Sequence, residues 1–138
     1  MTEAFLYFLW QFQYFDHTDL LTTEGELVQV VHPGFRNPNA GPDFLNARLL
    51  INDVEWVGTV EAHTKASDWL AHRHQHDRAY DNVILHIVWT DDRLPDTHHP
   101  NSARRRPTST DGSTIPSLEL QSRTSSNLLN SYNALTDS

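Results

Sequence analysis

The chain has 138 residues, 38% of them hydrophobic and 10% aromatic, and a formal net charge of -8. This length suits one domain with a hydrophobic core, and the absence of cysteine excludes disulfides and thiolate metal sites. The acidic balance is unfavourable for binding phosphate backbones, which counts against nucleic acid as a partner. A chain without cysteine suits a reducing compartment, and we expect a cytoplasmic protein.

The N-terminal segment 3–15 is apolar and aromatic on all sides of a helix. It lacks a basic start and a small-residue cleavage site, and Gln11 and Gln13 interrupt it. It is therefore a poor signal peptide and too short to span a bilayer, and we expect no membrane partner. The pattern predicts a buried helix, with Thr2 as a possible N-cap and Glu3 in the first turn.

Three strands are predicted next. Residues 27–32 are short and β-branched, and residues 44–51 and 54–64 flank the hairpin turn Asn52-Asp53. The dense Asn, Pro and Gly region 37–42 predicts a loop at the mouth of a site. Together these segments predict a three-strand meander.

The second half of the chain is predicted as a crossover and further strands. Residues 69–81 have the spacing of an amphipathic helix, and the apolar run 83–89 is typical of a central strand. Residues 96–113 are rich in Pro, Ser, Thr and His and predict a mobile loop. Residues 114–121 indicate one more short strand, and residues 127–135 a weak helix.

This order predicts an α/β fold: a helix, a three-strand meander, a crossover helix and a further strand. We divide the chain into an α/β core over residues 1–93, a flexible loop over 94–113 and a C-terminal strand and helix over 114–138.

Two carboxylates on adjacent predicted strands form the main candidate site. Asp43 stands just before one strand, and the two-residue period of the next places Glu61, His63 and Lys65 on one face. A hard cation such as Mg²⁺ or Mn²⁺ held by two carboxylates would suit phosphodiester hydrolysis. Alternatively, Asp43 only ends the turn and Glu61 pairs with an arginine; the residues alone leave both interpretations open.

Histidine and arginine clusters give weaker signals. His72 and His76 are four apart on the predicted helix and, with a carboxylate, have a spacing that binds zinc. His74 is expected to point elsewhere, and a solvated helix face is the competing interpretation. The run 104–106, three arginines, either contacts phosphate or forms a solvated loop. His98-His99 is given no role.

The segments HPGFRNPNAGPDFLNARLLI, WVGTVEAHTKASDW and HRHQHDRAYDNVILHIVW occur in an order that resembles an uncharacterised bacterial family known only as a domain of unknown function. The resemblance covers most of residues 3–121, including IPSLEL, and corresponds to the N-terminal part of longer members. The chain therefore resembles a truncated or split version of them.

The layout also resembles the PD-(D/E)XK nuclease superfamily, whose fold is restriction-endonuclease-like. Pro42-Asp43 matches its PD piece, Glu61-Ala62-His63 stands at its (D/E)XK piece, and His76-x-x-x-Tyr80 is similar to the Gln-x-x-x-Tyr helix of an exonuclease-like branch. The resemblance implies Mg²⁺ or Mn²⁺ held by Asp43 and Glu61, with nucleic acid as the substrate.

The departure from that pattern is His63, where the superfamily usually has lysine. Lys65 or Arg73 would have to substitute, with Arg73, His76 and Tyr80 expected on the substrate side. The leading hypothesis is a metal-dependent nuclease whose catalytic residues are Asp43, Glu61, His63 and Lys65. The alternative is an inactive domain of the same fold that binds protein or nucleic acid.

Overall fold

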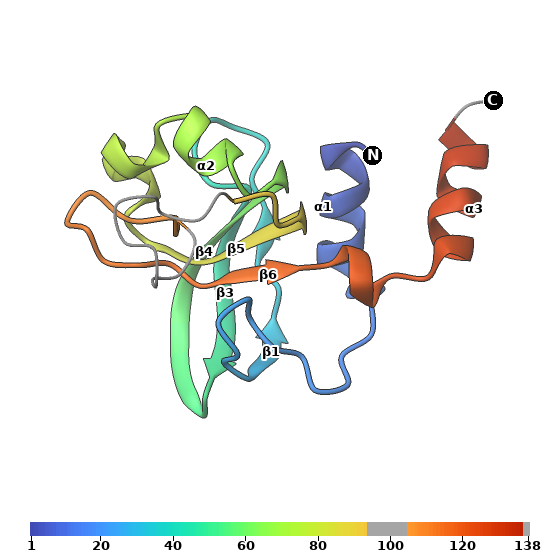
Figure 1. The fold of residues 1–138 in the computed structure, drawn as a ribbon, viewed down its shortest axis with the longest axis horizontal. Helices are drawn as coiled ribbons and strands as arrows, with labels where there is room; N and C mark the ends of the chain where they lie inside the picture. Colours follow the sequence, from blue (N-terminus) through green and yellow to red (C-terminus); the bar gives the residue numbers. More distant parts are fainter. Residues whose placement is uncertain (94–104, 137–138) are drawn as a thin grey trace.

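The computed structural model describes residues 1–93 and 105–136. In this part of the chain, one curled mixed sheet of six strands is accompanied by three α-helices, which makes the fold mixed α/β (Figure 1). Among the described residues, no helix has the length and apolar composition needed to cross a membrane.

Helix α1, Glu3–Phe12, is the predicted N-terminal helix. The Thr2 hydroxyl caps it by accepting a hydrogen bond from the Phe5 backbone N–H at 3.3 Å. It ends earlier than predicted because Gln13 adopts a left-handed conformation, with φ of 56°. Its buried side chains face the sheet: Phe5, Leu6, Leu9 and Trp10.

The predicted three-strand meander is confirmed. Strands β1 (Val28–His32), β3 (Phe44–Ile51) and β4 (Val54–Lys65) pair in that order, both pairs antiparallel, and the two-residue strand β2 (Phe35–Arg36) also pairs with β3. The β3–β4 turn is Asn52-Asp53, and both residues have positive φ, as a tight hairpin requires.

Two parallel strands complete the sheet. Strand β5, Val83–Thr90, pairs in parallel with β4, and β6, Ser117–Glu119, pairs in parallel with β5. The order is therefore β1-β3-β4-β5-β6. The predicted apolar strand is central, and all its residues except the last are buried. The predicted C-terminal strand extends the sheet that the first 93 residues begin.

The prediction of a single crossover helix is wrong. The segment between β4 and β5 consists of a short helix α2, Asp68–Ala71, and two 3₁₀ turns, η1 (His74–His76) and η2 (Arg78–Tyr80). Arg73 interrupts the helix with a left-handed backbone, φ of 59°. Asp77 is extended and caps η2, its side chain accepting from the Ala79 N–H at 2.9 Å.

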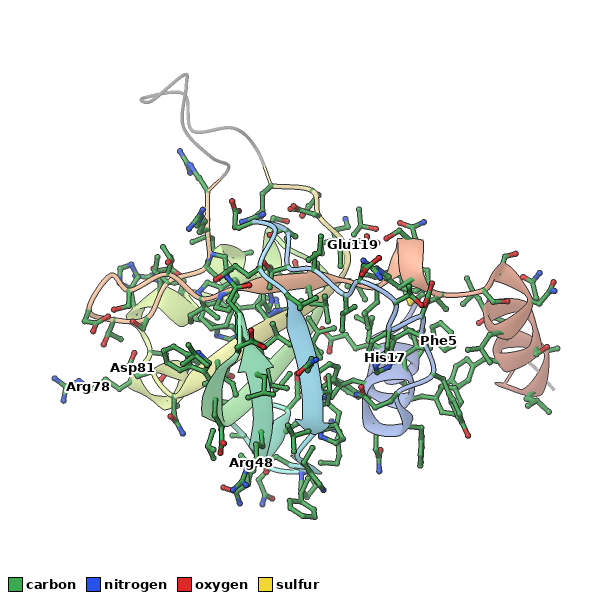
Figure 2. All side chains as sticks on the ribbon, turned by 90° about the horizontal axis from the view of Figure 1, so that it is seen from below. Phe5, His17, Arg48, Arg78, Asp81 and Glu119 are labelled. Carbon is green, nitrogen blue, oxygen red and sulfur yellow. The ribbon has the colours of Figure 1, made fainter. Side chains whose placement is uncertain are left out.

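The C-terminal helix packs on the side of α1 that faces away from the sheet (Figures 1 and 2). Helix α3, Ser126–Thr136, follows the 3₁₀ turn η3, Gln121–Arg123, and both views place α1 between α3 and the sheet (Figures 1 and 2). The Tyr132 ring lies 4.7 Å from the Phe5 ring of α1, centroid to centroid. The predicted 127–135 helix is confirmed.

The first part of the predicted loop 96–113 lies outside the described residues, and His98-His99 lies wholly outside them. Its described end is held to the crossover: the Thr110 backbone N–H and hydroxyl donate to Asp81 at 2.8 and 2.7 Å. Figure 2 shows Asp81 and Arg78 at the end of the molecule opposite α3. Arg106 pairs with Glu24 at 2.8 Å, so it is engaged with protein rather than free for phosphate.

The two faces of β4 have different surroundings. Val60 and Ala62 belong to the main core, together with the buried side chains of α1. Glu61 and His63 face the other way, toward the crossover, where Trp69 centres a smaller core. The predicted alternation along β4 is therefore observed, with a polar site on the crossover side.

Gly58 allows β4 and β5 to approach closely. A Cβ atom there would lie 2.6 Å from both the Asn82 carbonyl oxygen and the Ile84 Cγ2. We expect Gly58→Ala to lower the free energy of unfolding by about 1–3 kcal/mol through overpacking. Urea denaturation measures this change, and Val57→Ala, at an exposed position of the same strand, is the control. Equal effects of the two substitutions would contradict the close approach.

Candidate metal site

The strand register brings Asp43 and Glu61 together. Phe44 of β3 pairs with Val60 of β4, so the preceding Asp43 lies beside Glu61 at the start of β3. Asp43 Oδ2 accepts a hydrogen bond from the Ala62 N–H at 2.9 Å, which fixes the carboxylate against β4. Each carboxyl group affects the pKa of the other, as expected of two acids in close proximity. The two acids that the sequence singled out are therefore neighbours.

Burial makes two negative charges at this place unfavourable. Glu61 is only 4% exposed, and the Asp43 side chain 14%. Burial, together with the hydrogen bond and the negative charge of Glu61, raises the pKa of Asp43 to about 7. Burial also raises the pKa of Glu61 to about 7, against the lowering effect of its hydrogen bond to Asp43. Such a pair is stabilised by a shared proton or a bound cation.

Two residues outside the predicted set surround Asp43. The Tyr7 hydroxyl lies 3.2 Å from Asp43 Oδ1 and 3.0 Å from Glu3 Oε2. Burial, with these two carboxylates, raises the pKa of Tyr7. The Arg36 guanidinium lies 3.7 Å from Asp43 Oδ1, donates to the Asp43 carbonyl at 2.9 Å, and stacks over the Tyr7 ring at 4.0 Å. Neither residue carried a local sequence signal.

Histidines surround Glu61 on its other side. His74 Nε2 lies 2.9 Å from Glu61 Oε2, and His63 Nε2 lies 3.6 Å from the same oxygen. His63 Nδ1 in turn lies 2.8 Å from His86 Nε2 on β5. Burial lowers the pKa of all three imidazoles, to about 3 for His63, so all three are neutral.

The pairing of His72 with His76 is corrected by the structure. Because Arg73 is left-handed and α2 has ended, the side chains of His72 and His74 both face His63, whereas His76 is exposed. The expectation that His74 points elsewhere is therefore wrong. An uninterrupted helix would have placed His72 and His76 on one face, and no pattern in the sequence announces the left-handed residue.

The other predicted site residues lie at the margin. Lys65 is exposed and makes no ion pair with either carboxylate in the described part of the chain; its charge acts on Asp92. Arg73 is exposed as well. Tyr80 is half-buried and stacks on the His74 ring at 3.7 Å between centroids, so it supports the histidine beside Glu61. Burial, and then the charge of Glu61, raise the pKa of Tyr80 to about 12.

Comparison with known proteins gives one match. A family model described as "Protein of unknown function (DUF2851)" matches residues 3–138, a range that includes both carboxylates and every histidine of the site. The chain belongs to the DUF2851 family. This confirms the resemblance to a family of unknown function. Neither the curated proteins nor the solved structures gave a match to this DUF2851 member.

Proposed function

We propose that the domain is a metal-dependent nuclease that hydrolyses phosphodiester bonds of nucleic acid, with Asp43 and Glu61 holding Mg²⁺ or Mn²⁺. The observation that carries the proposal is the pair of neighbouring, largely buried carboxyl groups on adjacent strands. Paired carboxylates of raised pKa are typical of sites that use charge in chemistry, because burying them without a ligand is unfavourable.

The residues fit a hard cation. Glu61 Oε1 is buried and has no hydrogen-bond partner, although a buried carboxylate oxygen normally has one. Asp43 and Glu61 offer oxygen ligands, which Mg²⁺ and Mn²⁺ prefer. When bound, the cation would neutralise charge on the scissile phosphate and activate water.

The order of elements supports the same proposal. Helix α1, the antiparallel strands β1, β3 and β4, the crossover and the parallel strand β5 follow the plan of the PD-(D/E)XK nucleases that the sequence resembles. In that plan, the acids stand where Asp43 and Glu61 stand here. We therefore propose that the mixed α/β fold of this domain is restriction-endonuclease-like.

The chain's own residues then have distinct tasks. His63, at the position where the superfamily has lysine, is neutral and cannot supply a positive charge. Among the described residues, Arg36 is the only arginine or lysine within 4 Å of either carboxylate. We assign to Arg36 the binding of a substrate phosphate, and to Asp43 and Glu61 the binding of the cation.

Glu61→Gln tests this assignment. It removes one negative charge and leaves the shape nearly unchanged, so we expect loss of Mn²⁺-dependent nicking of plasmid DNA and of structured RNA. Glu55→Gln is the matched control, because Glu55 lies on the same strand, is exposed and pairs with Arg48 at 3.5 Å. Its activity should equal that of the natural protein. Equal nicking by both variants would contradict the role of Glu61.

A non-catalytic domain of the same fold is the second candidate. The observations that favour it are the net charge of -8 and the exposed position of the single lysine, Lys65, away from the acid pair. It predicts Mn²⁺ binding without turnover on either DNA or RNA. Metal binding by calorimetry together with a negative nicking assay would select it over the enzyme.

A further inference from the structure

We propose a second metal site, in which a borderline transition metal such as Zn²⁺ is bound by the imidazoles of His63, His72 and His74 and by the carboxylate of Glu61. The site lies on the crossover side of β4. It shares Glu61 with the acid pair but does not use Asp43. It therefore goes beyond the proposed function, and it can stand or fail independently of nuclease activity.

The distances suit a tetrahedral ion. One nitrogen atom of each histidine lies within 4.8 Å of the corresponding atoms of the other two. Glu61 Oε2 lies 2.9 Å from His74 Nε2 and 3.6 Å from His63 Nε2. Ligands at about 2.0–2.1 Å from a tetrahedral zinc ion are roughly 3.3 Å from one another. The two distances from Glu61 lie on both sides of that value. The donors that lie within 4.8 Å of one another are the three histidines without Glu61, so the exposed His72 side chain has to move toward Glu61 for all four groups to bind one ion.

Unsatisfied atoms point to a missing ligand. His74 Nε2 is buried and makes no hydrogen bond, although Glu61 Oε2 is only 2.9 Å away. The oxygen therefore lies off the direction in which an N–H would donate. Two polar atoms that are close but not hydrogen-bonded are what two ligands of one absent ion would look like. Buried polar atoms without partners are rare in native proteins.

A second layer of residues holds the imidazoles in place. His63 Nδ1 lies 2.8 Å from His86 Nε2, and a donor proton on Nδ1 leaves the Nε2 lone pair free on the side of Glu61. Tyr80 stacks on His74, and the Trp69 ring meets His74 edge-on at 5.2 Å. Neutral imidazole is the form that binds a metal.

The backbone and the solvent access also suit an ion. The left-handed conformation of Arg73 is unusual for a residue other than glycine, and it is what directs both His72 and His74 to one point. His63 and His74 are buried, whereas His72 is exposed and opens the cluster to solvent. An ion can therefore enter at His72. Imidazole ligands select Zn²⁺ and its neighbours rather than Mg²⁺.

The test is titration of the full chain, freed of metal with chelator, with Zn²⁺ in a calorimeter. We expect one equivalent of Zn²⁺ to bind, and Co²⁺ in its place to show the visible absorption of a tetrahedral ion. His72→Ala should weaken Zn²⁺ binding at least about tenfold, the smallest loss seen even for supporting partners of a metal ligand. Because His72 is exposed, this variant should keep its fold, which circular dichroism checks.

A matched control makes the result decisive. His76→Ala, at an exposed histidine outside the cluster, should bind Zn²⁺ as the natural chain does. No Zn²⁺ binding, or equal binding by the natural chain and His72→Ala, would overturn the proposal. Zn²⁺ affinity that falls in Asp43→Asn but not in His72→Ala would place the ion at the acid pair, and would overturn it as well.

Discussion

Asp43→Asn is expected to produce a protein that is more stable without metal but no longer binds Mn²⁺ tightly or cleaves nucleic acid. Asparagine keeps an oxygen to accept the Ala62 N–H, and its amide can donate to Glu61. The repulsion between two buried carboxylates is thereby removed, and with it one ligand of the cation. If the two buried carboxylates repel each other, the substitution should increase stability and decrease function at the same time.

The gain in stability should depend on pH. The folded-state pKa of Asp43 is raised from 3.8 to about 7, so between these values the folded protein binds more protons than the unfolded chain. Its free energy of unfolding therefore falls as the pH rises through this window. Asp43→Asn removes that contribution. The difference in melting temperature between the variant and the natural protein should be larger at pH 8 than at pH 5.

Asp53→Asn is the matched control for this substitution. Asp53 is exposed in the β3–β4 hairpin with φ of 65°, a conformation that asparagine tolerates. It should leave the melting temperature, its pH dependence and Mn²⁺ binding unchanged. An Asp43→Asn protein that melts at a lower temperature without metal, or that binds Mn²⁺ as tightly as before, would argue against the acid pair as a cation site.

Trp69→Ala should be among the most destabilising single changes in the described chain. The Trp69 side chain is fully buried beneath the histidines, and its indole N–H donates to the Thr108 carbonyl at 3.0 Å. Truncation leaves a cavity and an unpaired carbonyl, for which we expect a loss of about 3–5 kcal/mol in the free energy of unfolding. His74 and His86 both pack edge-on against this ring, so Zn²⁺ binding should weaken too.

Trp56→Ala provides the comparison. Trp56 lies on β4 and is 50% exposed, so its truncation should lower the free energy of unfolding by about 1 kcal/mol or less. Chemical denaturation followed by circular dichroism measures both variants. Similar losses for the two tryptophans would contradict a supporting core beneath the site.

The sheet was predictable because its signals are local. The runs that became β3, β4 and β5 are apolar or alternating and are bounded by turn residues such as Asn52-Asp53. The crossover was not predictable from the sequence. The spacing of its aromatic and histidine residues fits a helix of about three turns, whereas Arg73 and Asp77 in fact adopt non-helical backbone conformations. Tertiary contacts of Trp69, Tyr80 and the neighbouring histidines take precedence over helical propensity there.

The candidate site shows the same division. Asp43 and Glu61 could be placed side by side because strand pairing alone determines their distance. The sequence did not predict that three further residues reach the site, because each comes from another element through a turn or a helix face: His74, Arg36 and Tyr7. The replacement of lysine by histidine at position 63 could be read in the sequence, but the burial of His63 against His86 could not.

The most direct test of the central claim is anomalous X-ray diffraction from crystals of the natural chain grown with Mn²⁺. We predict an anomalous peak whose centre lies within about 2.0–2.6 Å of a carboxylate oxygen of both Asp43 and Glu61. A structure in which both carboxyl groups are fully ordered but no peak lies between them at the same Mn²⁺ concentration would contradict the account.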